Sequence, residues 1–82
     1  MIKVLFFAQV RERLGQASVE VDASQVSTTE DLRQHLASQS EKWQLVLAND
    51  QLLVAVNQAI SNWQSPVADG DEVAFFPPVT GG

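Results

Sequence analysis

The segment Asp69-Gly70-Asp71-Glu72-Val73-Ala74-Phe75-Phe76-Pro77 decides how we expect this chain to fold. Its Asp-Gly-Asp start is typical of a tight turn, and the alternation over Glu72–Phe76 predicts a strand. Proline cannot donate a hydrogen bond to a sheet, so strand pairing should end at Pro77. Side chains alternate between the two faces of a strand, which places Phe75 in the core and Phe76 on the exposed face.

Three further strands are predicted upstream of this segment. Ile2–Ala8 alternates, with Leu5 and Phe7 on the face that is partly exposed. Ser18–Asp22 also alternates and should form a hairpin with the first strand. Leu52–Val56 is an almost continuous apolar run, from which we expect the most buried strand of the sheet.

Helices are predicted between these strands. Ser27-Thr28-Thr29-Glu30-Asp31 carries hydroxyl groups followed by acids, which favour a helix start because they bind its free N–H groups and suit its dipole. Leu32 and Leu36 lie four residues apart, so the helix should be amphipathic and lie on the sheet. A second short helix is expected over 42–47, and a short helical connection over 10–14.

The predicted order is strand, strand, helix, short helix, strand, strand, with the first and last strands paired in parallel at the centre of the sheet. This is the order of the ubiquitin-like β-grasp, an α+β fold in which a mixed sheet packs on one main helix and one short helix. The connection through the helix is the right-handed crossover that parallel strands require. We expect one domain over 1–77, followed by a flexible C-terminal diglycine tail over 78–82.

Composition narrows the possible functions. The chain has 82 residues, of which 45% are hydrophobic and 18% are charged, as is typical of one small globular domain without room for a deep catalytic cavity. The formal charge of −5 disfavours binding to nucleic acid, whose phosphates attract clustered lysine and arginine. No segment has the length of a membrane span or the pattern of a signal peptide, so we expect a cytoplasmic protein that binds no membrane.

Few side chains suggest catalysis by this chain alone. It contains no cysteine and one histidine, His35, which we expect on the helix surface rather than in a catalytic pair. The acids of the segment 69–72 are better explained by a turn than by a metal site. The glycines do not form a phosphate-binding loop, so any ATP should be bound by a partner. We therefore expect no bound metal or cofactor and no independent enzyme activity.

The C-terminal pair Gly81-Gly82 is the candidate reactive element. Glycine lacks a Cβ, so such an end is narrow enough to enter the active site of another protein. Its carboxylate is a poor electrophile until a partner activates it, for example as a mixed anhydride with AMP. The activated carbonyl could then accept an amine or a sulfur donor. Frayed termini also collect glycines, but the apolar run from Phe75 to Val79 is unlike a discarded tail.

A partner-binding surface is predicted next to this tail. Phe7 and Phe76 belong to strands that we expect to be neighbours, and with Ile60 they would form an exposed apolar patch. A lone soluble domain has little reason to display such a patch. Pro77 and Pro78 stiffen the root of the tail, which reduces the entropy that is lost when the tail is inserted.

The segment from Asp69 to Gly82 resembles the C-terminal signature of the molybdopterin synthase small subunit. The segments Ile2–Ala8, Leu32-Arg33-Gln34 and Leu53–Gln58 resemble the same family, so the similarity spans essentially the whole chain. A bare diglycine on a β-grasp would also suit a thiamine-pathway sulfur carrier or a ubiquitin-like modifier. Those proteins are not expected to carry Phe-Phe-Pro-Pro before the glycines.

The resemblance implies a sulfur carrier in molybdenum cofactor biosynthesis. A ubiquitin-activating-like adenylyltransferase would adenylate Gly82, which would become a thiocarboxylate and give its sulfur to cyclic pyranopterin monophosphate. The transfer would take place in the large synthase subunit, which would supply the catalytic side chains. Each dithiolene needs two sulfur atoms, and the family forms a heterotetramer of two carriers on a large-subunit dimer. The partner-binding residues that the resemblance implies, besides the Gly81-Gly82 tail, are Phe7, Ile60, Phe76, Pro77, Pro78, Val79 and Thr80.

Two other functions remain open at this point. The chain would be a protein modifier if Gly82 forms isopeptide bonds with other proteins. It would be a plain interaction module if the tail only docks, in which case masking its carboxylate would leave function unchanged.

Overall fold

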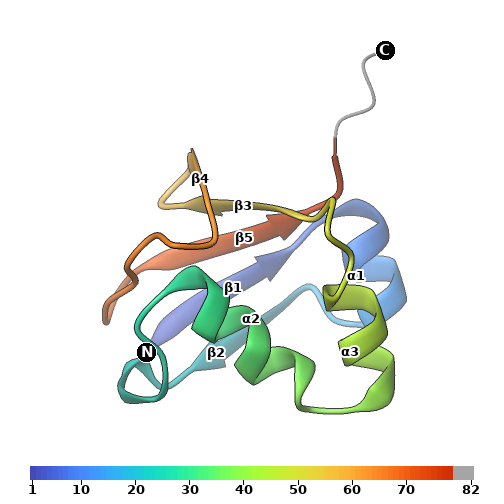
Figure 1. The fold of residues 1–82 in the computed structure, drawn as a ribbon, viewed down its shortest axis with the longest axis horizontal. Helices are drawn as coiled ribbons and strands as arrows, with labels where there is room; N and C mark the ends of the chain where they lie inside the picture. Colours follow the sequence, from blue (N-terminus) through green and yellow to red (C-terminus); the bar gives the residue numbers. More distant parts are fainter. Residues whose placement is uncertain (79–82) are drawn as a thin grey trace.

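Figure 1 shows the computed structural model, which describes residues 1–78. One mixed sheet has the strand order β2-β1-β5-β3-β4. β1 and β5 run parallel at its centre, and the other neighbouring strands are antiparallel. This confirms the predicted α+β class and the central parallel pair. The strands are β1 (Ile2–Phe6), β2 (Ser18–Val21), β3 (Leu53–Val56), β4 (Ala59–Ser61) and β5 (Glu72–Phe76).

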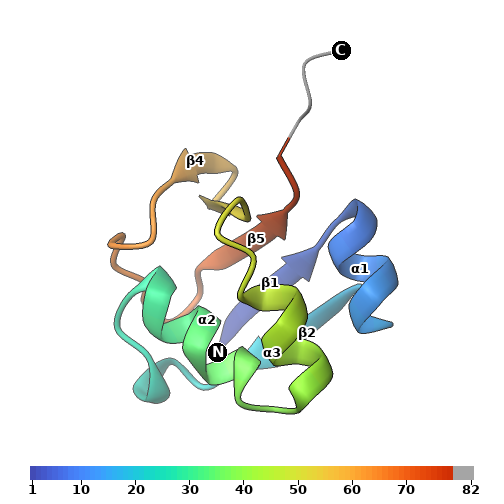
Figure 2. The ribbon, with the colours of Figure 1, turned by 45° about the vertical axis from the view of Figure 1, so that its right-hand side comes forward.

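The two main helices lie on one face of this sheet, as Figures 1 and 2 show. The predicted helix start is confirmed, because the Thr28 hydroxyl accepts a hydrogen bond from the backbone N–H of Asp31. The Ser40 hydroxyl begins the next helix in the same way, by accepting from the N–H of Trp43. The helical elements are α1 (Ala8–Leu14), a 3-10 turn η1 (Ala23–Gln25), α2 (Thr29–Ala37) and α3 (Glu41–Leu47).

The core lies between the two central strands and the helices. Phe6 of β1 and Phe75 of β5 are almost fully buried, and their ring centroids are 6.0 Å apart. Trp43 of α3 packs edge-on against Phe6 at 5.6 Å, and Trp63 packs against Phe75 at 5.4 Å. These aromatic pairs therefore join the centre of the sheet to α3 and to the loop that precedes β5.

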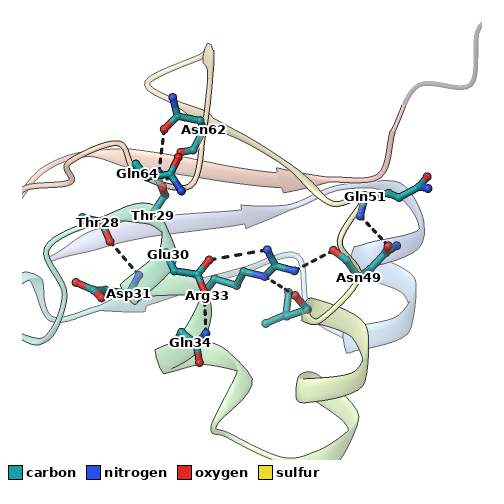
Figure 3. A network of polar contacts seen from close by, with 11 residues as sticks. Thr28, Thr29, Glu30, Asp31, Arg33, Gln34, Asn49, Gln51, Asn62 and Gln64 are labelled. Atoms are coloured by element: carbon teal, nitrogen blue, oxygen red, sulfur yellow. Dashed lines mark hydrogen bonds and ion pairs between the residues drawn. The ribbon is translucent and has the colours of Figure 1, made fainter.

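Arg33 connects three parts of this helical layer, as Figure 3 shows in part. Arg33 lies on α2. Its Nε donates to the carbonyl oxygen of Leu47 at 2.6 Å, and its Nη2 donates to the carbonyl oxygen of Asn49 at 2.9 Å. Leu47 is the last residue of α3, so the guanidinium satisfies a carbonyl that the helix leaves free, and Asn49 belongs to the loop that follows the helix. The guanidinium carbon also lies 4.5 Å from the ring centroid of Trp63.

The first strand is shorter than predicted. Pairing of β1 ends at Phe6, and Phe7 is the residue that begins α1, whereas we expected a strand up to Ala8 and helical structure only from Val10. Ala8 has a positive φ of 52°, a conformation that cannot continue a strand. The chain therefore turns away from the sheet immediately after Phe6, which leaves Phe7 at the rim.

The sequence also did not predict β4. Asn57 and Gln58 have positive φ values of 50° and 71°, which is the geometry of a two-residue hairpin turn between β3 and β4. The run Leu52–Val56 is strongly buried, as expected: Leu52, Val54 and Ala55 are buried, and Leu53 and Val56 are half-buried. By comparison, β1 carries the exposed Lys3, and three of the five residues of β5 are only half-buried.

The acidic segment 69–72 forms a turn, as expected. One Asp71 oxygen accepts from the backbone N–H of Ala68 at 2.9 Å, and Gly70 has the positive φ of 91° that glycine tolerates. Asp69 forms an ion pair with the amino group of Met1, and this hydrogen bond raises the pKa of the amino group above its ordinary value. These carboxylates therefore form polar contacts that fix the turn at the start of β5.

We predict that Asn57 stabilises the β3–β4 hairpin in two separable ways. Its side chain accepts from the N–H of Glu72 at 3.0 Å and donates to Asp71 at 3.1 Å, and its backbone is left-handed. Asn57→Gly should lose the two side-chain hydrogen bonds and cost about 1 kcal/mol of unfolding free energy. Asn57→Ala should cost about 2 kcal/mol because it adds backbone strain. Urea denaturation measures both, and equal stability of the two variants would contradict the role of the backbone conformation.

Candidate partner-binding site

The sheet has one face that α2 and α3 do not cover, and we call it the open face. Strand register identifies its residues, because Leu53 is paired with Phe76, and Ala55 is paired with both Ala74 and Ile60. Paired residues point to the same side of a sheet. Four strands contribute residues to the open face. These residues are Lys3 and Leu5 of β1, Glu72, Ala74 and Phe76 of β5, Leu53 and Ala55 of β3, and Ile60 of β4.

Phe7 and Ile60, two of the predicted partner-binding residues, are strongly exposed. Ile60 exposes 73% of its surface and Phe7 exposes 45%. Phe76 is half-buried, as is Leu53 beside it. Phe7 lies next to Phe76 because its N–H donates to the carbonyl oxygen of Phe75 at 3.2 Å. The structure therefore brings Phe7 and Phe76 together, while Ile60 lies two strands away on the β3–β4 hairpin.

Sequence reasoning missed the apolar residues that connect these positions. Leu53, Ala55 and Ala74 complete the open face between Ile60 and Phe76. The signal was present in the continuous apolar run 52–56, because a strand that is apolar at consecutive positions is apolar on both of its faces. The prediction of a buried strand concerns burial alone, whereas one face of this strand belongs to the open face.

The tail leaves the domain at the end of β5, between α1 and the loop that follows α3 (Figures 1 and 2). Pro77 and Pro78 are half-buried, so the root of the tail is held against the domain. Val79, Thr80, Gly81 and Gly82 lie outside the described residues. The small depression of about 30 Å³ at this point is lined by Gln9, Val10, Arg13, Val46, Asn49, Leu52 and Pro77.

Within residues 1–78, histidine and acidic side chains form no cluster that could hold a metal ion, and no helix is long and apolar enough to cross a membrane. His35 is half-buried and lines a groove between β2 and α2, on the helix side of the sheet. The open face offers an apolar docking surface beside Pro77 and Pro78, where the described part of the chain ends.

The ThiS family model matches residues 4–82 of the chain. The molybdopterin synthase sulfur carrier subunit of Escherichia coli K12 is 60% identical over 82 residues, and the match covers the whole of both chains. Similarity at this level extends across the sheet, the helices and the C-terminal segment.

Two solved structures extend the comparison. The Haloferax volcanii small archaeal modifier protein 1 superposes with a TM-score of 0.76 at 26% identity, covering 95% of this chain and 97% of that one. A chain in the protein–protein complex of subunits 1 and 2 of the molybdopterin-converting factor from Helicobacter pylori gives a TM-score of 0.68. It is 24% identical, with coverage of 99% and 97%, and the likeness shows the shared fold.

We predict that Ile60, the most exposed apolar residue of the open face, contributes little to stability. Ile60→Ser should change the free energy of unfolding by less than about 1 kcal/mol, because Ile60 is already mostly exposed. Val54→Ser is the matched change on the opposite face of the adjacent strand, and it should cost about 3 kcal/mol because Val54 is 1% exposed. Chemical denaturation of both variants tests this, and a comparable loss for Ile60→Ser would show that the residue packs into the domain.

Proposed function

The chain belongs to the ThiS family, and on this premise we propose that it is the sulfur carrier subunit of molybdopterin synthase. One observation carries the proposal: the chain is 60% identical, from end to end, to a protein with that name. The position of the tail root supports it, because Pro77 follows directly from the strand that carries Phe76 of the open face. A partner bound to that face would have the tail within reach.

The chemistry we propose takes place on the carboxyl group of Gly82. A carboxylate oxygen attacks the α-phosphorus of ATP, bound by an activating adenylyltransferase, and pyrophosphate leaves. A sulfur nucleophile at the oxidation level of sulfide then attacks the carbonyl carbon, and AMP leaves with the bonding electrons. The resulting thiocarboxylate is itself a nucleophile: its sulfur attacks a carbon of cyclic pyranopterin monophosphate, and an oxygen leaving group departs from that carbon with the bonding electrons. Water then cleaves the acyl–sulfur bond, which leaves the sulfur on the pterin and restores the carboxylate of Gly82.

The open face would dock on both proteins that use the tail. Its apolar centre and the exposed Ile60 and Phe7 suit burial against a complementary surface. Because the activating enzyme and the large synthase subunit would bind the same face, we propose that they compete for the carrier. A ternary complex in a competition titration would contradict this.

The division of labour follows from the small size of the domain. The large subunit would supply the catalytic groups for sulfur transfer, and the present chain would supply the sulfur and the docking surface. We propose a cytoplasmic heterotetramer in which two carriers bind a dimer of large subunits. ATP would be bound only by the activating partner. The Helicobacter pylori structure is a complex of subunits 1 and 2 of the molybdopterin-converting factor, so a chain of this fold can act as one subunit of a larger assembly.

A protein modifier is the second candidate function. The similarity to the Haloferax volcanii small archaeal modifier protein 1 favours it, since the two folds superpose over nearly the whole of both chains. A modifier would use the same adenylated Gly82 but would transfer it to an amine. Conjugates trapped from cells, joined through Gly82, would support this function over sulfur transfer.

We predict that incubation with the activating enzyme, ATP and a sulfur donor increases the intact mass by about 16 mass units, because one oxygen is replaced by sulfur. Tandem mass spectrometry should place the change at Gly82. Addition of one residue after Gly82 should abolish both the mass change and molybdopterin formation, while the unfolding midpoint stays the same. Sulfur transfer by the extended chain would contradict the proposal.

We predict that Ile60→Ser weakens binding to the large subunit about tenfold or more, because the side chain would be buried at the interface. Gln25→Ser, at an exposed position in η1, is the control and should bind as the wild type does. Isothermal titration calorimetry gives both dissociation constants. Equal affinity for the two variants would exclude the open face as the docking surface.

A further inference from the structure

A second surface feature, where α1 meets α3, is not explained by the open face. Leu45 of α3 is 78% exposed, more than any other large hydrophobic side chain of the described residues. Helix α3 turns Leu47 into the core and half-buries Trp43 and Val46, so Leu45 points away from the domain. Nothing in the packing of α3 requires an apolar residue at this position.

Two cations flank Leu45. A shallow depression of about 380 Å³ is lined by Arg13 of α1 together with Lys42, Leu45 and Val46 of α3. Lys42 reaches across to α1, since its Nζ is 4.0 Å from where a Cβ on Gly15 would lie. Within residues 1–78, neither Arg13 nor Lys42 has a carboxylate within 4.0 Å. We call these four lining residues the basic patch.

The basic patch stands out against the charge of the whole chain. The sequence has ten acidic and five basic residues, yet the depression has two basic lining residues and no acidic one. Cations near the C-terminal end of a helix suit its dipole. This accounts for Arg13, in the last turn of α1, and for Lys42, whose Nζ approaches Gly15 at that same end, but not for the exposed Leu45. Cations around an apolar side chain are complementary to a protein surface with carboxylates around an apolar contact.

The basic patch is continuous with the root of the tail. Arg13 and Val46 line both this depression and the smaller one that contains Pro77. A protein that encloses the tail must pass over Pro77, and the basic patch is the next surface that it would meet. On the opposite side of Pro77 lies Phe76 of the open face.

We infer that the basic patch binds an acidic surface of the large synthase subunit, next to the place where that subunit receives the tail. This inference rests on the proposed function. The patch provides a second contact, separate from the open face, so the large subunit holds the carrier on both sides of the tail root. Attraction between opposite charges there chiefly speeds association, and it weakens as salt screens the charges.

The test compares two variants of equal charge. Arg13→Gln with Lys42→Gln removes two cations from the basic patch, and Gln25→Glu with Gln39→Glu adds two acids at exposed positions of η1 and the α2–α3 connection. At low salt the first variant should bind the large subunit about fivefold or more weakly than the wild type, and the difference should narrow at high salt. The second should bind within about twofold of the wild type, and Leu45→Ala should bind a few times more weakly. The inference would be overturned if the Arg13/Lys42 variant and the Gln25/Gln39 variant weakened binding equally. It would also be overturned if the Arg13/Lys42 variant and Leu45→Ala both bound with the affinity of the wild type.

A measurement on the unmutated chain covers the case in which a variant fails to fold. The methyl NMR signals of Leu45 should shift on titration with the large subunit, together with those of Ile60. A shift of Ile60 without a shift of Leu45 would overturn the inference and leave the proposed function intact. Failure of the wild-type chain to bind the large subunit at all would contradict the proposed function itself.

Discussion

The parallel pairing of β1 with β5 is the constraint on which the rest of the molecule depends. It sets Phe6 opposite Phe75 in the middle of the sheet, where both rings are buried under the helices. Parallel strands end at the same edge, so the chain leaves β1 through Phe7 and leaves β5 through Pro77 at neighbouring points. An apolar side chain, the first turn of α1 and the root of the tail therefore lie together without any separate element that positions them.

Because side chains alternate along the strands, the residues that stabilise the domain and the residues available to a partner lie on opposite faces of the sheet. On the helix side, residues such as Phe75 and Val54 are excluded from water, and each contributes about 2–3 kcal/mol through burial. The opposite side keeps apolar residues that α2 and α3 do not cover, and Ile60 among them is largely exposed. The β3–β4 hairpin adds to that side by presenting Ile60, and the contacts of Asn57 with Glu72 and Asp71 fix the hairpin on β5. A small domain can thus be stable on one face and available to partners on the other.

Sequence patterns predicted the element order, the central strand pair, the start of α2 and the exposure of Phe7 and Ile60, because these follow from periodicity and capping chemistry. They did not predict β4, since Asn57-Gln58 lacks the glycine that usually marks a left-handed hairpin turn. They also extended β1 too far, because alanine rarely has a positive φ and the residue type therefore gives no sign that the chain turns at Ala8. The sequence also could not assign Leu53 and Ala55 to the open face. An apolar run indicates that both faces of a strand are apolar, but it does not indicate whether a helix or a partner protein covers each face.

The predicted roles of Val79, Thr80, Gly81 and Gly82 remain predictions, because the structure describes residues 1–78.

The most direct test of the central claim, that sulfur leaves this chain from Gly82, is a single-turnover reaction. Thiocarboxylated carrier would be mixed with the large subunit and cyclic pyranopterin monophosphate, without ATP or any other sulfur source, and both carrier forms would be counted by mass spectrometry as molybdopterin appears. We expect two carriers to return to the carboxylate form for each dithiolene that is made. Formation of molybdopterin while the thiocarboxylate persists, or loss of the thiocarboxylate without product, would contradict a sulfur carrier role.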